Sequence, residues 1–63
     1  MADKRKVQIG DRFARLDDGT RFTVITNPVH TGYTITCEII ADGSKNPQTV
    51  STKTLREDFE RTE

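Results

Sequence analysis

The sequence has few of the residues that build covalent cross-links or metal sites. Its 63 residues include one cysteine, one histidine and no tryptophan. A single cysteine cannot form a disulfide within the chain, and a metal site normally draws on three or four cysteine, histidine or carboxylate ligands. We therefore expect a fold without a disulfide, a metal or a cofactor. One unpaired thiol fits a reducing compartment, so we expect a cytoplasmic protein.

Net charge and long apolar runs are absent as well. Ten lysines and arginines balance ten aspartates and glutamates, so the field of the whole molecule gives no argument for nucleic acid or an anionic membrane. No apolar run approaches the roughly 20 residues of a membrane-spanning helix. The positive start, residues 1–6, is not followed by the apolar stretch of a signal peptide. We expect no membrane partner.

No catalytic constellation can be assembled from the sequence. Ser44 and Ser51 have no base that the sequence can place beside them, and a serine nucleophile needs such a partner. Cys37 is expected to face inward between Ile35 and Ile39, where a thiol usually packs as a small hydrophobic group. Neither a Gly-x-Gly-x-x-Gly motif nor a Walker-type loop is present, so nucleotide binding has no support. We expect a protein that is not an enzyme.

The length limits the chain to one small domain. At 63 residues it lies near the lower limit of independent stability, with room for one thin core. Residues 1–6 are polar and charged, which predicts a flexible basic N-terminal arm. We expect residues 7–63 to form the single folded domain.

The clearest structural signal is the alternation in residues 33–41. One face of the expected strand carries Tyr33, Ile35, Cys37 and Ile39, and the other carries Thr34, Thr36, Glu38 and Ile40. A period of two among β-branched residues predicts a half-buried strand. Turn residues bound the segment at both ends. We expect this strand to be the centre of a sheet, with its first face inward.

Shorter strand-like segments flank this centre. Residues 17–20, Asp-Asp-Gly-Thr, are the strongest hairpin signal in the chain, because Asp-Gly supplies the positive φ angles of a tight turn. This turn joins expected strands at residues 12–16 and 21–26. Residues 27–32 and 42–47 contain proline and glycine and predict loops. Residues 48–51 predict a short strand.

The C-terminal segment has two readings. Residues 54–57 match a capping-box pattern, and Leu55 and Phe59 stand four apart, which favours one or two helical turns. The alternative is a single 3₁₀ turn at residues 52–55 and a closing strand at residues 56–61 that carries Phe59 inward. A sheet needs a last strand to cover its open edge, and a lone short helix is marginal in water. We favour the turn and strand.

This order of elements resembles the SH3-like small β-barrels, which include KOW and Tudor-like modules and the stand-alone barrels of phages and plasmids. Two segments carry the resemblance. They are residues 7–13, with a Gly-Asp turn into the first strand, and residues 50–55, a short strand leading to Leu55. The resemblance implies an all-β fold: a five-stranded barrel with a short 3₁₀ or helical turn near the C-terminus, whose leucine plugs the barrel end.

The resemblance supplies a fold more than a function. Peptide-binding SH3 domains present a row of aromatic residues, and methyl-ligand readers build an aromatic cage. This chain has only three phenylalanines and one tyrosine. The core needs most of these rings, so too few remain for an aromatic binding surface. Stand-alone barrels of this length are typical of phages and mobile elements. The resemblance therefore implies a non-enzymatic protein-binding module, such as an inhibitor or adaptor acting on a host protein.

The expected protein-binding surface is an apolar spot on the outward face of the sheet. Strict alternation places Ile25 and Ile40 outward, and small monomers seldom leave such residues exposed. Val29 and His30, in the neighbouring loop, complete the candidate set. Either the barrel curls enough to cover the two isoleucines, or these residues contact another protein or a second copy of the chain, which is the hypothesis that we follow.

The alternative is a KOW-like nucleic-acid-binding module. Its candidate residues form a basic patch: Lys4, Arg5, Lys6, Arg12, Arg15 and Arg21. A stripe of this kind recognises phosphates. Asp11, Asp17 and Asp18 lie among these residues and partly cancel their field, so the protein-binding hypothesis ranks first.

Overall fold

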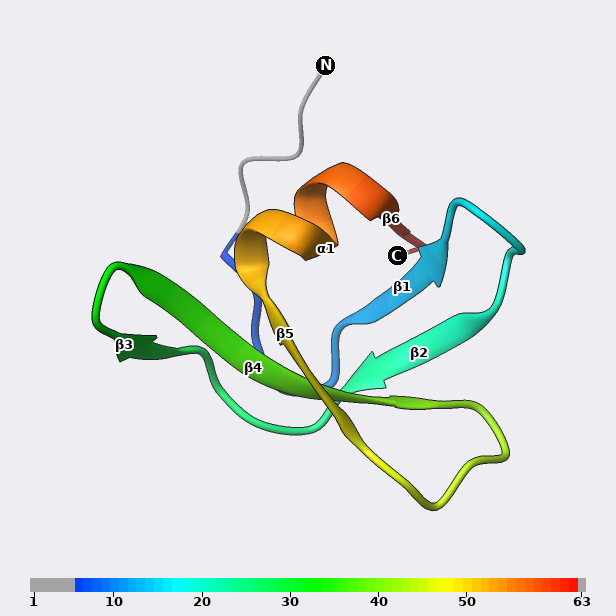
Figure 1. Cartoon of the computed structure of the whole chain (residues 1–63). Coiled ribbons are helices and arrows are strands. Elements are labelled where there is room, and N and C mark those ends of the chain that lie inside the picture. Colours follow the sequence, from blue (N-terminus) through cyan, green and yellow to red (C-terminus); the bar gives the residue numbers. More distant parts are fainter. Residues whose placement is uncertain (1–5, 63) are drawn as a thin grey trace.

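Six short strands and one helix form the part of the chain that the computed structural model describes, residues 6–62 (Figure 1). They are β1 (Arg12–Arg15), β2 (Arg21–Val24), β3 (Val29–Thr31), β4 (Thr34–Ala41), β5 (Gln48–Ser51), α1 (Thr52–Asp58) and β6 (Phe59–Arg61). Strands account for 46% of the described residues and the helix for 12%, which confirms the mostly β fold. The expected N-terminal arm falls outside the described residues except for Lys6, which is exposed. No helix in residues 6–62 is long and apolar enough to cross a membrane.

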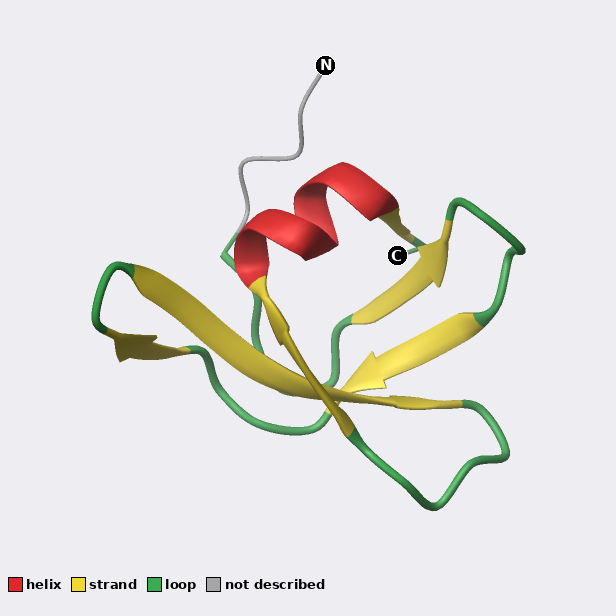
Figure 2. Cartoon of the chain, in the orientation of Figure 1, coloured by secondary structure: helices red, strands yellow, loops and turns green. Residues whose placement is uncertain are grey.

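The long strand β4 is the centre of the sheet, as the alternation predicted (Figure 2). All of its pairings are antiparallel. Thr36 is paired with both β3 and β5, and Ile39 with both β2 and β5. The strand β5 therefore runs along one edge of β4, while β2 and β3 share the other edge. The sheet continues from β2 to β1 and then to β6.

The inner face of the sheet carries the core. Its buried apolar side chains are Val7, Phe13, Phe22, Val24, Cys37, Ile39, Leu55 and Phe59. Along β4 the burial alternates, with Cys37 and Ile39 buried and Glu38 and Ile40 only half-buried on the outer face. Phe22 and Phe59 meet edge to face, with ring centroids 5.4 Å apart, a favourable aromatic geometry. The strict period of two in β4 thus separates core from surface.

The expectation that Tyr33 faces inward is wrong, because Tyr33 belongs to a turn. Residues 29–31, expected to be a loop, form β3, and Thr31 pairs with Thr34. Only Gly32 and Tyr33 remain to connect the two strands. Gly32 has a φ of +61°, a value that glycine adopts at little cost in a two-residue hairpin turn. Tyr33 is therefore fully exposed at the tip of the hairpin.

Both C-terminal readings are partly correct, since a helix is followed by a strand. The helix α1 has seven residues and its N-cap is Ser51, whose side chain accepts a hydrogen bond from the amide of Thr54 at 3.1 Å. The expected capping pattern, which starts at Thr54, is three residues late. Leu55 is fully buried from the helix, and Phe59 is buried at the start of β6. The last strand β6 pairs with β1.

The expected five-stranded barrel is wrong in two respects, because the sheet has six strands and is open. The additional strand is β3. Within residues 6–62, β5 and β6 have no pairing with each other, although a closed barrel would need its last strands joined. The helix α1 lies between them in the chain and packs against β4, β5 and β6. It covers one side of the core in place of a closing strand pair (Figure 2).

Cys37 provides a test of the inner face. Burial raises the pKa of its thiol above the ordinary 9.0. Above pH 9 the unfolded chain therefore loses this proton before the folded chain does, and the free energy of unfolding falls as the pH rises. We expect Cys37→Ala to cost about 1 kcal/mol at pH 7. The difference from the parent should shrink at pH 10.

Urea denaturation of the parent and Cys37→Ala at both pH values measures these effects. Every other group that titrates in this pH range is common to the two proteins, so its contribution cancels in the comparison. Rapid modification of Cys37 by a thiol reagent under native conditions would contradict its place in the core.

Candidate binding groove on the open side of the sheet

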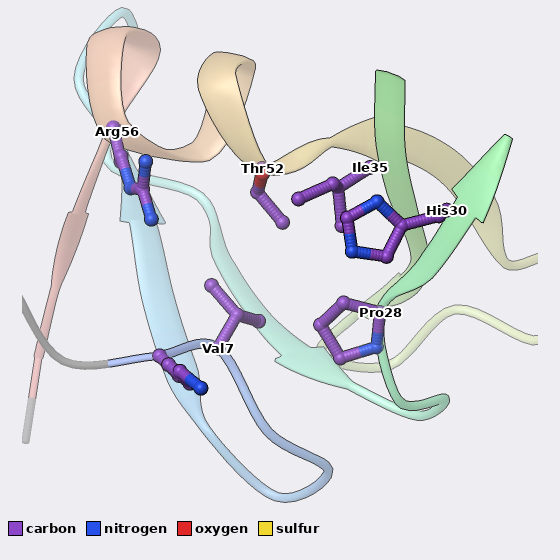
Figure 3. A pocket seen from close by; sticks show the side chains of 7 residues that line it. Val7, Pro28, His30, Ile35, Thr52 and Arg56 are labelled. Atoms are coloured by element: carbon purple, nitrogen blue, oxygen red, sulfur yellow. The ribbon is translucent and has the colours of Figure 1, made fainter. Parts of the chain in front are cut away.

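A pocket lies where the inner face of the sheet is left uncovered between β3 and α1 (Figure 3). The register of β3 places His30 directly opposite Ile35 of β4, on the same face as the core. From the other side, Thr52 and Arg56 stand one helical turn apart on α1. The pocket has a volume of about 330 Å³. Its lining residues are Lys6, Val7, Pro28, His30, Ile35, Thr52 and Arg56.

The pocket has an apolar base and cationic walls. Val7 is buried, and Pro28 and Ile35 are half-buried. Figure 3 shows Arg56 across the pocket from His30 and Pro28, with Val7 between them. Lys6 and Arg56 are exposed, and none of the lining residues is acidic. The pocket is therefore locally positive on a chain whose formal net charge is zero.

A second hollow of about 280 Å³ adjoins the first and shares Ile35 and Thr52 with it. It adds Tyr33, Thr34, Ser51 and Lys53 to the lining. We call the two hollows together the β4–α1 groove. Tyr33 and Ile35, two residues apart, both line it, and again no lining residue is acidic. The groove therefore runs from the exposed tyrosine to the cations Lys6 and Arg56.

The four predicted protein-binding residues do not form one surface. His30 lines the groove. Val29, its neighbour in β3, is 60% exposed and pairs with Thr36 on the outer face. Ile40 is half-buried on that face, and Ile25, which follows β2, is 37% exposed.

Backbone hydrogen bonds bring Ile25 close to Ile40 on the outer face. The amide of Ile25 donates to the carbonyl of Glu38 at 2.9 Å, and the amide of Glu38 donates to Oγ1 of Thr26 at 2.9 Å. Ile25 therefore lies opposite Glu38, beside Ile40. The half-buried Glu38 side chain divides this face and makes it less apolar than expected.

The predicted basic patch is largely neutralised by ion pairs. Arg12 contacts Asp42 at 2.8 Å, and Arg15 contacts Asp18 through two hydrogen bonds, of 2.8 and 3.1 Å. The hydrogen bond from Arg15, with a further one from the Thr20 amide, holds the pKa of Asp18 well below its usual range. The Asp18 carboxylate therefore stays charged at neutral pH.

The other members of the patch are scattered. Lys4 and Arg5 lie outside the described residues. Arg21, next to buried Phe22 in β2, is exposed on the outer face, whereas Lys6 lines the groove on the inner side. Arg12 and Arg15 are held in ion pairs with aspartates, and Arg21 faces outward. These three residues of the patch therefore do not share a surface with the groove.

Most of the groove was missed at the level of the sequence. No sequence pattern singles out its cations on α1, Lys53 and Arg56, and the sequence places Val7 in a strand entry and Pro28 in a loop. These residues come from three separate segments, so no local spacing connects them. The signal that could have pointed to the groove is the positive φ expected at Gly32, which would have made residues 29–36 a hairpin.

The groove contains polar groups but no assembled catalytic set. The Oγ of Ser51 is engaged with Thr54 in the helix cap, so it has no free role as a nucleophile. Within residues 6–62, no group of three or more histidine, cysteine or acidic side chains is placed to hold a metal ion. The arrangement can bind a ligand through apolar contact, hydrogen bonds and positive charge.

Comparison with protein-family models, with curated proteins and with solved structures finds no match to this chain.

Proposed function

We propose that this chain is a small non-enzymatic protein-binding module whose contact surface is the β4–α1 groove. The observation that carries the proposal is a groove with an apolar base, three exposed cations and no acidic lining residue on a neutral chain. Buried apolar contacts supply most of the affinity of a protein interface, and charges around them give specificity. The groove combines both elements.

The shape of the groove favours a partner protein over a small molecule. Small-molecule sites enclose most of their ligand in a volume of roughly 300–1,000 Å³. The larger hollow, of about 330 Å³, is at the lower limit of that range, and it shares Ile35 and Thr52 with the second hollow, of about 280 Å³. Two adjoining small hollows of this kind fit side chains presented by another protein.

The likeness to SH3-like modules is consistent with a binding role. The described elements are the hairpin β1–β2, the long β4, the short β5, a helix that buries Leu55 and a last strand beside β1, with the additional strand β3 that the resemblance did not imply. Such modules act mainly by binding. The open sheet of this chain leaves the inner face accessible beside β3, where the groove lies.

Protein capture from a lysate tests the proposal with two matched baits. Ile35→Lys places a charge in the groove, and Ile25→Lys makes the same change on the outer face. Both residues are at least partly exposed, so each change should alter the free energy of unfolding by about 1 kcal/mol or less. Circular dichroism checks that both variants fold.

We expect a partner protein, identified by mass spectrometry from nuclease-treated lysate, to bind the parent and Ile25→Lys but not Ile35→Lys. Loss with Ile25→Lys alone would move the interface to the outer face that contains Val29 and Ile40. Capture that disappears on nuclease treatment would replace the proposal with nucleic-acid binding.

A further inference from the structure

We propose that the partner segment in the β4–α1 groove is an extended acidic peptide. One of its bulky apolar side chains lies on Val7, Pro28 and Ile35, and an adjacent carboxylate lies between Lys6 and Arg56. This inference rests on the proposed function, and it adds the chemistry of the ligand.

Charge complementarity is the first argument for an acidic ligand. Lys6 and Arg56 are exposed, and within residues 6–62 neither forms an ion pair. Lys53, at the other end of the groove, is 4.0 Å from Glu57, with both side chains more than half exposed. Such a pair is weak, so Lys53 is available to a ligand. Arginine and lysine beside a carboxylate make strong charge-assisted hydrogen bonds.

The distribution of the acidic residues strengthens this argument. Within residues 6–62, Arg12, Arg15 and Arg61 are matched by Asp42, Asp18 and Asp11, whereas Arg21 and Lys45 have no such ion pair and line neither hollow of the groove. Among the described residues, the groove brings Lys6 and Arg56 to one pocket that has no acidic lining residue. The ligand therefore has to supply the negative charge.

The apolar base requires a hydrophobic side chain next to that charge. A peptide of acidic residues alone would leave Pro28 and Ile35 covered by polar groups, which gains little from burial. Ile35 and Tyr33 are alternate residues at the groove. Alternate side chains of an extended peptide are about 6.8 Å apart, so such a peptide can reach from Ile35 of β4 to Tyr33 in the adjoining turn. The geometry thus fits an extended segment that contacts both positions.

A single nucleic-acid strand fits the same surface less well. Its bases need aromatic stacking platforms, whereas the groove has one aromatic residue, Tyr33, and an otherwise aliphatic base. The arginines that would follow a phosphate backbone, Arg12 and Arg15, are paired with aspartates. These observations favour the peptide.

Selection from a display library of random peptides tests the inference on the full chain. The parent, immobilised through its C-terminus, is expected to enrich peptides in which aspartate or glutamate adjoins leucine, isoleucine or phenylalanine. Arg56→Glu reverses one groove charge, and Arg21→Glu makes the same change on the outer face as a control. We expect Arg56→Glu to lose the acidic preference and Arg21→Glu to keep it.

An enriched peptide then gives a quantitative measure. Its Kd for Arg56→Gln should rise by about fivefold or more, because one charge contact is lost, and the Kd for Arg21→Gln should stay within twofold, to about the accuracy of such titrations. Amide chemical shifts should move for Val7, Ile35 and Arg56 when the peptide binds. Circular dichroism confirms that all four variants fold like the parent.

The outcomes separate this inference from the proposed function. Enrichment of neutral or basic peptides, equal enrichment by Arg56→Glu, or no enrichment overturns the acidic-peptide inference. If Ile35-dependent capture of a protein from lysate persists in any of these cases, the protein-binding function stands. Binding of an oligothymidylate probe with the same amide shifts overturns both.

Discussion

Replacing Arg61 with methionine is expected to lower the free energy of unfolding by about 3 kcal/mol, whereas the same change at Arg12 should cost less than about 1 kcal/mol. Both arginines form ion pairs with an aspartate. The Arg61 side chain is only 8% exposed, and its Nη1 lies 2.6 Å from Oδ2 of Asp11. The Arg12 side chain is 38% exposed and pairs with Asp42 at 2.8 Å. Burial distinguishes the two pairs.

The cost at Arg61 arises from the charge that is left behind. Asp11 is 25% exposed, and its Oδ2 also accepts the amide of Gln8 at 2.9 Å. Removal of the guanidinium leaves a poorly hydrated carboxylate, which is more costly than the loss of the attraction itself. Arg61 also lies over the ring of Phe13, 5.0 Å from its centroid. Methionine keeps an apolar contact with that ring, although it loses the cation–π contact together with the ion pair.

Urea denaturation of Arg61→Met, Arg12→Met and the double variant Asp11→Asn/Arg61→Met measures these differences. The double variant should recover part of the loss, because asparagine can accept the Gln8 amide without a charge. High salt should leave the Arg61 effect largely unchanged, since buried pairs are screened less than exposed ones. Equal losses at Arg61 and Arg12 would show that burial does not set the contribution of the pair.

Segments with a regular local pattern could be predicted from the sequence. The alternation in residues 33–41 identified the central strand because one face of β4 is buried and the other is not. The Asp-Gly turn identified the β1–β2 hairpin, where Gly19 has a φ of +76°. In both cases the backbone requirement and the side-chain pattern lie within a few adjacent residues.

Features that depend on distant segments could not be predicted in this way. Arg12 and Asp42 are 30 residues apart, so an arginine that looks available in the sequence is neutralised in the fold. Tyr33 continues the period of two, yet the short hairpin places it in the turn. A two-residue turn and a strand end have the same residue preferences at this point, and only the pairing of β3 with β4 separates them.

The candidate site also depends on contacts between distant segments, so most of it could not be predicted from the sequence. His30 could be identified as a polar loop residue, but its place opposite Ile35 depends on the register of β3. The groove also requires that α1 extend far enough to bring Arg56 across from His30. A one-turn 3₁₀ segment, the expectation from the SH3-like resemblance, would end before Arg56. The longer helix takes the place of a closing strand pair, which leaves the sheet open. It also provides one wall of the groove.

Ile39→Lys is expected to unfold the domain, whereas Ile40→Lys is expected to leave it folded. Ile39 is fully buried on the inner face of β4, and an unpaired ammonium there costs several kcal/mol. That cost is comparable to the total stability of a domain of this size, about 5 kcal/mol or less. Ile40 is half-buried on the outer face, opposite Thr23. A lysine at this position can lay its aliphatic chain along the sheet and hold its ammonium in water.

The two variants have the same composition and net charge, and their substitutions are adjacent in one strand, so only the face of the sheet differs. Thermal melts followed by circular dichroism should show no cooperative transition for Ile39→Lys. Ile40→Lys should melt cooperatively, with a loss of about 1 kcal/mol from the covered part of the isoleucine. A shift of the register by one residue would exchange the faces of the strand. The reverse result, a folded Ile39→Lys and an unfolded Ile40→Lys, would therefore contradict the register of β4 and, with it, the placement of Ile35 and His30 in the groove.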